Sequence, residues 1–196
     1  MRMRQLIFLP AALVLAGCAT VQAGPRAGGG PRECTASANT LSSPPGRAWM
    51  REQGWRFASE ADAAAAYSAL AAQASPWPDW VTPQDVVLPP GTRFQMAIGG
   101  GQTSAQPGAF GTFDNIDKVE EVRSNLAVKR AWKADVDRVV TYEVVRPLPA
   151  KVGPVGPQVD GEACRLLEGR WSQLQMQVPP AERMTYLKVV GERPVR

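Results

Sequence analysis

Two segments in the second half of the chain alternate between apolar and polar residues, and this pattern constrains the fold more than any other feature. Residues 92–98 read TRFQMAI and residues 172–178 read SQLQMQV. An apolar side chain at every second position is typical of a β-strand that buries one face. The chain therefore needs a sheet with a hydrophobic core on one side. The expected core faces are Phe94, Met96 and Ile98 in the first segment and Leu174, Met176 and Val178 in the second.

Other segments predict helices and further strands. Ser59 and Asp62 have the spacing of a capping box and precede an alanine-rich run, which predicts a helix there. A second helix is expected over residues 118–129. Strands are expected over residues 136–145 and 187–190, which are rich in β-branched residues. The sequence thus predicts an α+β fold, with one compact domain, a curved antiparallel sheet and two or three helices.

The absence of histidine limits the chemistry open to this protein. None of the 196 residues is a histidine, the side chain that most often serves as general base and metal ligand. Histidine-dependent catalytic triads and histidine zinc sites are therefore excluded. The chain also contains 18 glycines and 18 prolines, which favours turns and short strands over a helical bundle. No metal site and no cofactor are predicted.

The N-terminus has the pattern of a lipoprotein signal peptide. Arg2 and Arg4 precede a short apolar run that ends in Leu-Ala-Gly-Cys at residues 15–18. This tetrapeptide resembles the lipobox of bacterial lipoproteins, which implies cleavage before Cys18 and lipidation of that cysteine. The apolar run is too short to span a bilayer as a helix. Ala19 after the cysteine favours an outer-membrane anchor that faces the periplasm.

These features divide the chain into three expected parts. Residues 1–17 form the signal peptide, residues 18–46 form a tether rich in Gly, Pro and Ser, and residues 47–196 form a single globular domain. Cleavage would lower the net charge from +4 to +2, because Arg2 and Arg4 leave with the signal peptide. A small net charge and an exported chain argue against nucleic acid as a partner. An ordinary cleaved signal with an unrelated cysteine is the alternative.

Two cysteines follow the proposed lipidation site. Cys34 and Cys164 would be the remaining thiols of an exported chain, and an oxidising compartment favours their pairing. The alternative is a pair of buried free thiols. The sequence therefore predicts a disulfide that attaches the distal part of the tether to the domain.

A series of short motifs occurs in a fixed order between residues 86 and 178. The motifs are LPPGT at 88–92, GAFG at 108–111, RSNL at 123–126, YEVVRPLP at 142–149, VGPVGP at 152–157 and GRWSQ at 169–173. This order resembles the catalytic domain of the tuberculosis necrotizing toxin family. Members of that family are secreted NAD⁺ glycohydrolases that are related in fold to ADP-ribosyltransferases. The resemblance covers about half of the chain.

The resemblance implies roles for four residues. Gln173 matches the family's catalytic glutamine, which orients the nicotinamide ribose, and Arg123 matches the arginine that holds the pyrophosphate. A guanidinium suits phosphate oxygens, and a neutral amide suits ribose hydroxyls. We therefore expect Arg123 and Gln173 on facing walls of one groove, with Phe94, Phe110 or a tryptophan stacked on the nicotinamide. The implied activity is cleavage or binding of NAD.

A second interpretation stays open. Gln173, Gln175 and Gln177 also fit the solvent-exposed face of an amphipathic strand, and Arg123 with Glu120 fits a surface ion pair. The protein would then be a non-catalytic, periplasm-facing lipoprotein that binds a protein partner through exposed tryptophan, tyrosine and glutamine side chains. Convergence of Arg123 and Gln173 on one cleft would favour the enzyme, whereas a convex apolar patch would favour the binding protein.

Overall fold

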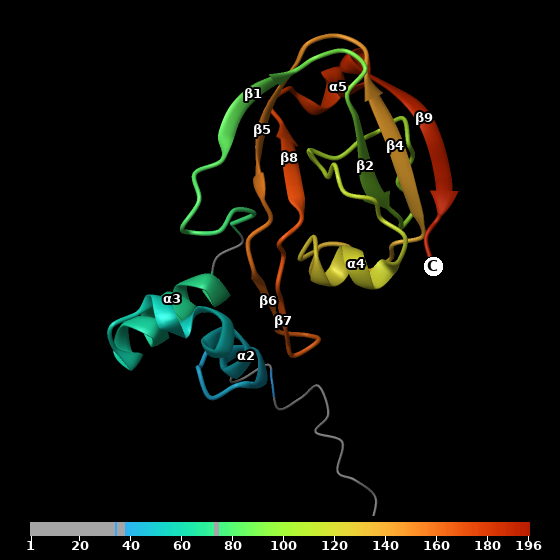
Figure 1. Cartoon of the computed structure of the whole chain (residues 1–196). Coiled ribbons are helices and arrows are strands. Elements are labelled where there is room, and N and C mark those ends of the chain that lie inside the picture. The colour runs from blue at the N-terminus through green and yellow to red at the C-terminus, as the bar shows by residue number, and fades with distance from the viewer. Residues whose placement is uncertain (1–33, 35–37, 73–74) are drawn as a thin grey trace, which may run out of the picture.

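The structure, a computed structural model, describes residue 34 and residues 38–72 and 75–196 (Figure 1). Within these ranges the chain forms helices near its N-terminal end and antiparallel sheets after them, so the α+β prediction is confirmed. The expected signal peptide and the lipidation site Cys18 lie outside the described residues and stay predictions. No helix in the described ranges is long and apolar enough to cross a membrane.

The first sheet contains four strands in the order β1-β5-β8-β3, and neighbouring strands are antiparallel. The predicted strand β8 lies inside this sheet. Successive side chains of a strand point to opposite faces, yet both Gln173 and Leu174 are buried, so both faces of β8 are covered at this point. The sequence does not predict β1 and β5, because prolines and glycines interrupt the alternation in β5. The strands are β1 (Gln84–Leu88), β3 (Phe110–Gly111), β5 (Leu148–Pro154) and β8 (Ser172–Met176).

The second sheet has the strand order β2-β4-β9 and confirms the alternation predicted for β2. Phe94, Met96 and Ile98 are buried, and the residues between them are half-buried. A backbone bridge between Gln95 and Thr112 links this sheet to the chain just after β3. The strands are β2 (Arg93–Ile98), β4 (Arg138–Val144) and β9 (Leu187–Pro194).

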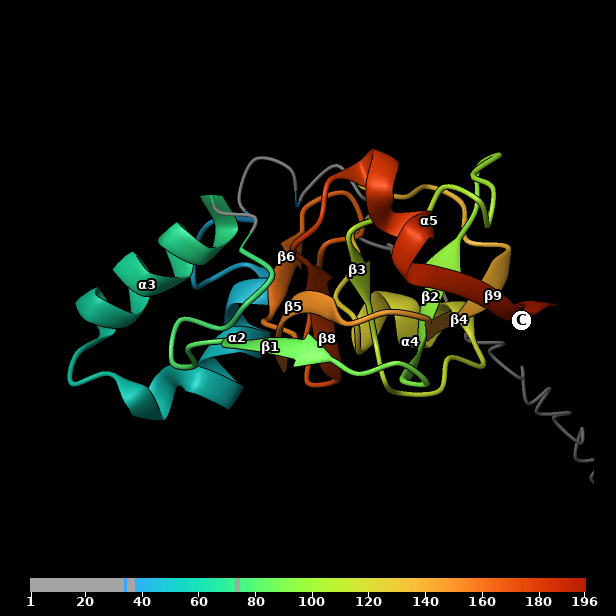
Figure 2. The ribbon, with the colours of Figure 1, turned by 90° about the horizontal axis from the view of Figure 1, so that it is seen from above.

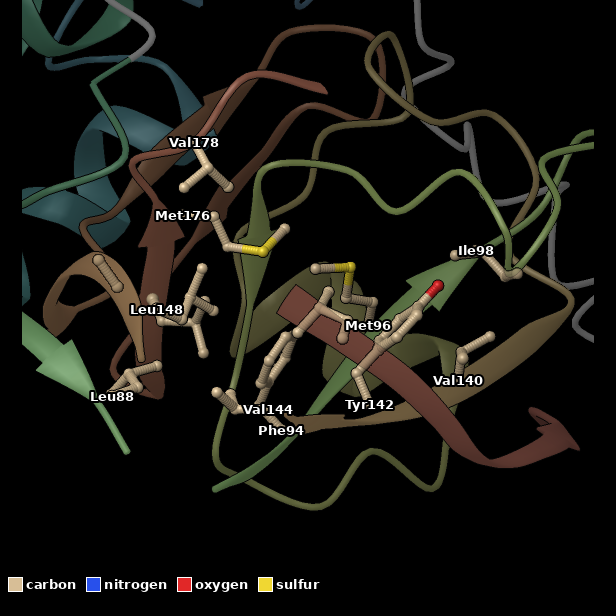
Figure 3. Packing of buried hydrophobic residues seen from close by; sticks show 13 residues of the cluster. Leu88, Phe94, Met96, Ile98, Val140, Tyr142, Val144, Leu148, Met176 and Val178 are labelled. Atoms are coloured by element: carbon tan, nitrogen blue, oxygen red, sulfur yellow. The ribbon is translucent and has the colours of Figure 1, made fainter. Parts of the chain in front are cut away.

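The largest hydrophobic core lies between the two sheets (Figure 3). Phe94 of β2 stacks on Tyr142 of β4, with ring centroids 5.8 Å apart. The first sheet contributes Leu148 and Leu174, which are fully buried in the same cluster. Each such side chain stabilises the fold by about 1.5 to 3 kcal/mol. This core therefore holds the two sheets at a fixed separation.

Two helices form the N-terminal part and pack against the β6–β7 hairpin, beside the first sheet and away from the second (Figure 2). The Ser59 hydroxyl accepts a hydrogen bond from the Asp62 backbone N–H at 3.1 Å, which confirms Ser59 as the N-cap, and it donates to Asp62 Oδ2 at 2.7 Å. Trp49 and Tyr67 are buried against Val159. The elements are α2 (Pro44–Gln53), η1 (Gly54–Arg56), α3 (Glu60–Ala72), β6 (Gln158–Asp160) and β7 (Arg165–Leu167).

A disulfide joins Cys34 to Cys164, as predicted. Cys164 lies in the turn of the β6–β7 hairpin, and 130 residues separate the two cysteines in the sequence. The helix α2 begins at Pro44, and Ala38 and Ser43 before it are buried. The last residues of the expected tether therefore pack on the fold.

The helix α4 (Val119–Ser124) is shorter than the predicted helix over residues 118–129. It cannot continue through Ala127, because this residue has a positive φ of 49°. Residues 125–134 instead form a loop without regular secondary structure. Figure 1 shows α4 at the lower ends of the two sheets. Two short helices, η2 (Pro180–Glu182) and α5 (Arg183–Tyr186), precede β9.

Candidate functional site

A cavity of about 500 Å³ opens between the two sheets, next to α4. This volume lies within the range of small-molecule sites, about 300 to 1,000 Å³. Its walls come from β2, the segment that enters β3, the loop after α4, and β6 and β8. No aspartate or glutamate of the described chain lines it. The lining amide and ammonium side chains are Gln95, Gln102, Lys133, Gln158 and Gln173.

Pro76, Val155, Gln158 and Gln173 form one wall, which we call the strand wall. The side chains of both glutamines are buried, since Gln158 is 2% exposed and Gln173 is 8% exposed. Gln158 Nε2 donates to the backbone oxygen of Ser75, and Gln173 Nε2 donates to the backbone oxygen of Pro76 at 3.3 Å. Two consecutive carbonyls therefore fix both amide nitrogens, which turns both amide oxygens away from this segment.

The two amide oxygens of the strand wall differ in access. Gln158 Oε1 is buried and accepts no hydrogen bond from the described residues. Gln173 Oε1 accepts none from them either, but it is not among the buried atoms. An unpaired buried acceptor costs about 1 to 3 kcal/mol and is rare in folded proteins. Gln173 Oε1 is thus an accessible acceptor, whereas Gln158 Oε1 is an enclosed acceptor without a partner.

A second wall, which we call the loop wall, consists of Leu126, Ala127, Val128, Trp132 and Lys133. Lys133 Nζ donates to the backbone oxygen of Ala97 and to Gln102 Oε1, both at 2.9 Å. Burial, together with a nearby guanidinium, lowers the pKa of Lys133. A bound anion would favour the charged ammonium again. The ring of Trp132 also lines the cavity and is about half exposed.

The structure places Arg123 outside the cavity, so it does not share a groove with Gln173. Its buried guanidinium donates to the backbone oxygens of Val128, Lys129 and Ala134 at 3.1, 3.4 and 3.0 Å. This happens because α4 ends one residue later and the chain folds back over the guanidinium. Burial also lowers the pKa of Arg123. Arg123 therefore holds the backbone of the loop wall and does not line this cavity.

The other predicted site residues also divide into those that line the cavity and those that do not. Phe110 lines the cavity, whereas Phe94 is 1% exposed and belongs to the core, because it occupies an inward-facing position of β2. Gln173 does not lie on a solvent-exposed strand face, because the segment at Pro76 covers its side chain and accepts its hydrogen bond. Gln177, just beyond β8, is the exposed glutamine of that run.

Sequence reasoning missed three cavity residues. Trp132 and Lys133 belong to the run Lys-Arg-Ala-Trp-Lys at residues 129–133, where basic residues stand on both sides of a tryptophan. Such a run is a recognisable signal of a binding loop. Gln158 has no comparable signal, because its role depends on the position of a three-residue strand.

A smaller cavity of about 250 Å³ lies by the segment 77–80. There the Arg56 guanidinium lies 4.2 Å from the ring centroid of Trp80 and pairs with Asp79 at 2.9 Å. The charged groups at this cavity are thus paired with each other. Trp77 also packs close to Gly153 of β5. This aromatic segment therefore contributes to packing.

Comparisons with known proteins show a shared fold but do not assign the chain to a family. No protein-family model and no curated protein matches the chain. A chain in the solved structure of Tne2 in complex with Tni2 has a TM-score of 0.52 and 24% sequence identity, over 61% of this chain and 97% of that chain. The complex of Rhs1-CT with its cognate immunity protein RhsI1 gives a TM-score of 0.40 and 16% identity, over 58% and 80%. The first similarity shows that the two chains share a fold.

Proposed function

We propose that this protein is an outer-membrane lipoprotein whose domain binds NAD⁺ in the cavity between its sheets and cleaves the bond between nicotinamide and ribose. One observation carries the proposal. Gln173, which the family resemblance marks as the catalytic glutamine, lies on the cavity wall with its amide nitrogen fixed and its amide oxygen accessible. The fold shared with a chain of the Tne2–Tni2 complex supports the same proposal.

The cavity suits this reaction because the leaving group needs no acid. The pyridinium nitrogen of NAD⁺ already carries positive charge, so nicotinamide departs as a neutral base when its bond to ribose breaks. Water then adds to the ribose carbon and releases a proton, which yields ADP-ribose. The sugar becomes oxocarbenium-like in the transition state, and a fixed amide oxygen that accepts from its hydroxyls stabilises that geometry. The lack of lining carboxylates in the described chain is compatible with this route.

Other lining residues supply the remaining contacts. Lys133 is the cationic side chain on the cavity wall and would hold the diphosphate, the role that the resemblance gives to Arg123. The half-exposed rings of Phe110 and Trp132 would stack on a base. Arg123 would support this set indirectly, through the loop that carries Lys133 and Trp132.

Turnover of NAD⁺ by the purified full chain tests the proposal. We expect Gln173→Ala to lower kcat/KM by about 10²- to 10³-fold, because it removes a contact that is made in the transition state. Gln177→Ala is the matched control, since Gln177 is exposed on the same chain segment. Absence of turnover in the wild-type protein, or an equal loss in both variants, would refute the proposal.

The lipid anchor is tested separately. We expect Cys18→Ser to leave the protein without acyl label and outside the membrane fraction, because the substitution removes the thiol that would carry the lipid. Palmitate labelling and fractionation of both forms measure this. Unchanged labelling of the variant would contradict the lipoprotein assignment.

A second candidate function is binding of a protein partner without catalysis. The observation that favours it is the exposure of Trp55, at 83%, and of Trp80, at 48%. The solved structure of Tne2 with Tni2, a chain of which shares the fold, is a complex of two proteins. Loss of partner capture in Trp55→Ala, with no NAD⁺ turnover in the wild type, would favour this function over the enzyme.

A further inference from the structure

We propose that Gln158 recognises the carboxamide of the nicotinamide and thereby selects the substrate. This inference rests on the proposed function and extends it, because the family resemblance gives Gln158 no role. The carboxamide NH₂ group would donate to Gln158 Oε1 while the adjacent ribose hydroxyl donates to Gln173 Oε1.

The first argument is the fixed orientation of the Gln158 amide. Its Nε2 donates to the backbone oxygen of Ser75. The opposite orientation would place Oε1 against that carbonyl oxygen, and two acceptors repel each other. The amide oxygen is therefore the free end of this side chain. Gln158 is thus a hydrogen-bond acceptor toward any ligand.

The second argument is the missing partner. Gln158 lines the cavity and is 2% exposed, and its Oε1 is a buried acceptor without a hydrogen bond from the described residues. Folded proteins rarely leave such an atom unpaired. A ligand donor that reaches it would remove the cost of the unpaired acceptor. The missing partner is a hydrogen-bond donor, because an amide oxygen can only accept.

The third argument is the position of Gln158 next to Gln173. Their amide nitrogens bind the carbonyls of consecutive residues, Ser75 and Pro76, so the two amides lie side by side on the strand wall. A ligand whose ribose hydroxyl meets Gln173 brings the base attached to that ribose toward Gln158. The neutral N–H donor on nicotinamide is its carboxamide. Because the resemblance assigns the nicotinamide ribose to Gln173, the proposal puts the nicotinamide end, and not the adenine end, at the strand wall.

The test compares two substrates in two proteins. The analogue 3-acetylpyridine adenine dinucleotide carries a methyl group in place of the carboxamide NH₂. We expect the ratio of kcat/KM for NAD⁺ to that for this analogue to fall by about 10- to 100-fold in Gln158→Met relative to the wild type. The intrinsic difference between the leaving groups cancels in this comparison. Loss of the Ser75 contact affects both substrates alike and also cancels.

Gln177→Met is the control and should keep the wild-type ratio. A second measurement needs no variant: the KM of the wild type should be about tenfold or more higher for the acetylpyridine analogue than for NAD⁺. An unchanged ratio in Gln158→Met, or equal KM values in the wild type, would overturn the inference although NAD⁺ is cleaved. A wild type that discriminates against the hypoxanthine analogue alone would place adenine at Gln158 and also overturn it. Absence of any NAD⁺ cleavage would instead refute the proposed function.

Discussion

The two walls of the cavity are held in place by different means. In the strand wall, Gln158 lies on β6, which pairs with β7, and Gln173 lies on β8, which pairs with β5. Their amide nitrogens donate to the backbone oxygens of the consecutive residues Ser75 and Pro76. In the loop wall, Trp132 and Lys133 come from a segment without regular structure, whose backbone is held by the buried guanidinium of Arg123. The orientation of the glutamine side chains in the strand wall thus depends on strand pairing, whereas the backbone position of the loop wall depends on the side chain of Arg123.

This difference separates two tasks in the proposed reaction. A carboxamide and a ribose are recognised by geometry, which requires rigid acceptors. A diphosphate is held largely by charge, which tolerates a less rigid cation such as Lys133. Changes in the strand wall should therefore alter selectivity, and changes in the loop wall should alter affinity.

The largest effect on stability is expected from the disulfide, which attaches the hairpin of Gln158 to Cys34. We expect Cys34→Ala with Cys164→Ala to lower the free energy of unfolding by about 2 to 5 kcal/mol, because the bridge restricts a long loop in the unfolded chain. Denaturant titration of both forms measures this change. An unchanged midpoint would show that the hairpin is fixed without the bridge.

Removal of the Arg123 guanidinium should be the next largest change. We expect Arg123→Met to lower the free energy of unfolding by about 2 to 4 kcal/mol, because three buried carbonyl oxygens lose a charged donor. The KM for NAD⁺ should rise more than kcat falls, since the loop wall contributes to binding. Arg123→Lys should recover part of both losses. A variant with normal stability and a large loss of kcat would mean that Arg123 contacts the substrate.

The smallest effect concerns Glu120 of α4, which forms an ion pair with Arg165 of β7. Hydrogen bonds from Arg165 and then Ser124, both at 2.7 Å, lower the pKa of Glu120. Its contribution to stability is therefore fully present above the unfolded-state pKa of about 4.3 and is lost as the pH falls through the lower folded-state pKa. Because the pair is largely exposed, we expect about 0.5 kcal/mol.

Thermal unfolding of Glu120→Gln and the wild type from pH 7 to pH 2 tests this prediction. The two proteins should differ slightly at neutral pH and converge at acid pH. A difference that grows as the pH falls would contradict the assigned sign.

The strands with a clear alternation could be predicted from the sequence, and the loop wall could not. Phe94 and Leu174 occupy the faces that the pattern predicts, because a sheet with one core imposes a period of two. Arg123 was placed in a longer helix, since its segment has helical periodicity, but the positive φ of Ala127 ends that helix. No local pattern encodes which carbonyls a buried guanidinium will meet.

The same contrast applies to the candidate site. Gln173 is marked in the sequence by the order of motifs, and it lines the cavity. Gln158 could not be found, because its importance depends on an unpaired oxygen that a sequence does not show. A sequence motif and an unpaired buried atom in the structure therefore identify different residues of the same candidate site.

The most direct test of the central claim is a crystal structure of the protein with carba-NAD⁺, in which a carbon replaces the ribose ring oxygen and prevents cleavage. The account predicts the nicotinamide end on the strand wall, with a ribose hydroxyl at Gln173 Oε1 and the carboxamide nitrogen within about 3 Å of Gln158 Oε1. The diphosphate should lie near Lys133. A dinucleotide bound at the smaller cavity by segment 77–80, or an empty cavity between the sheets at saturating ligand, would contradict the account.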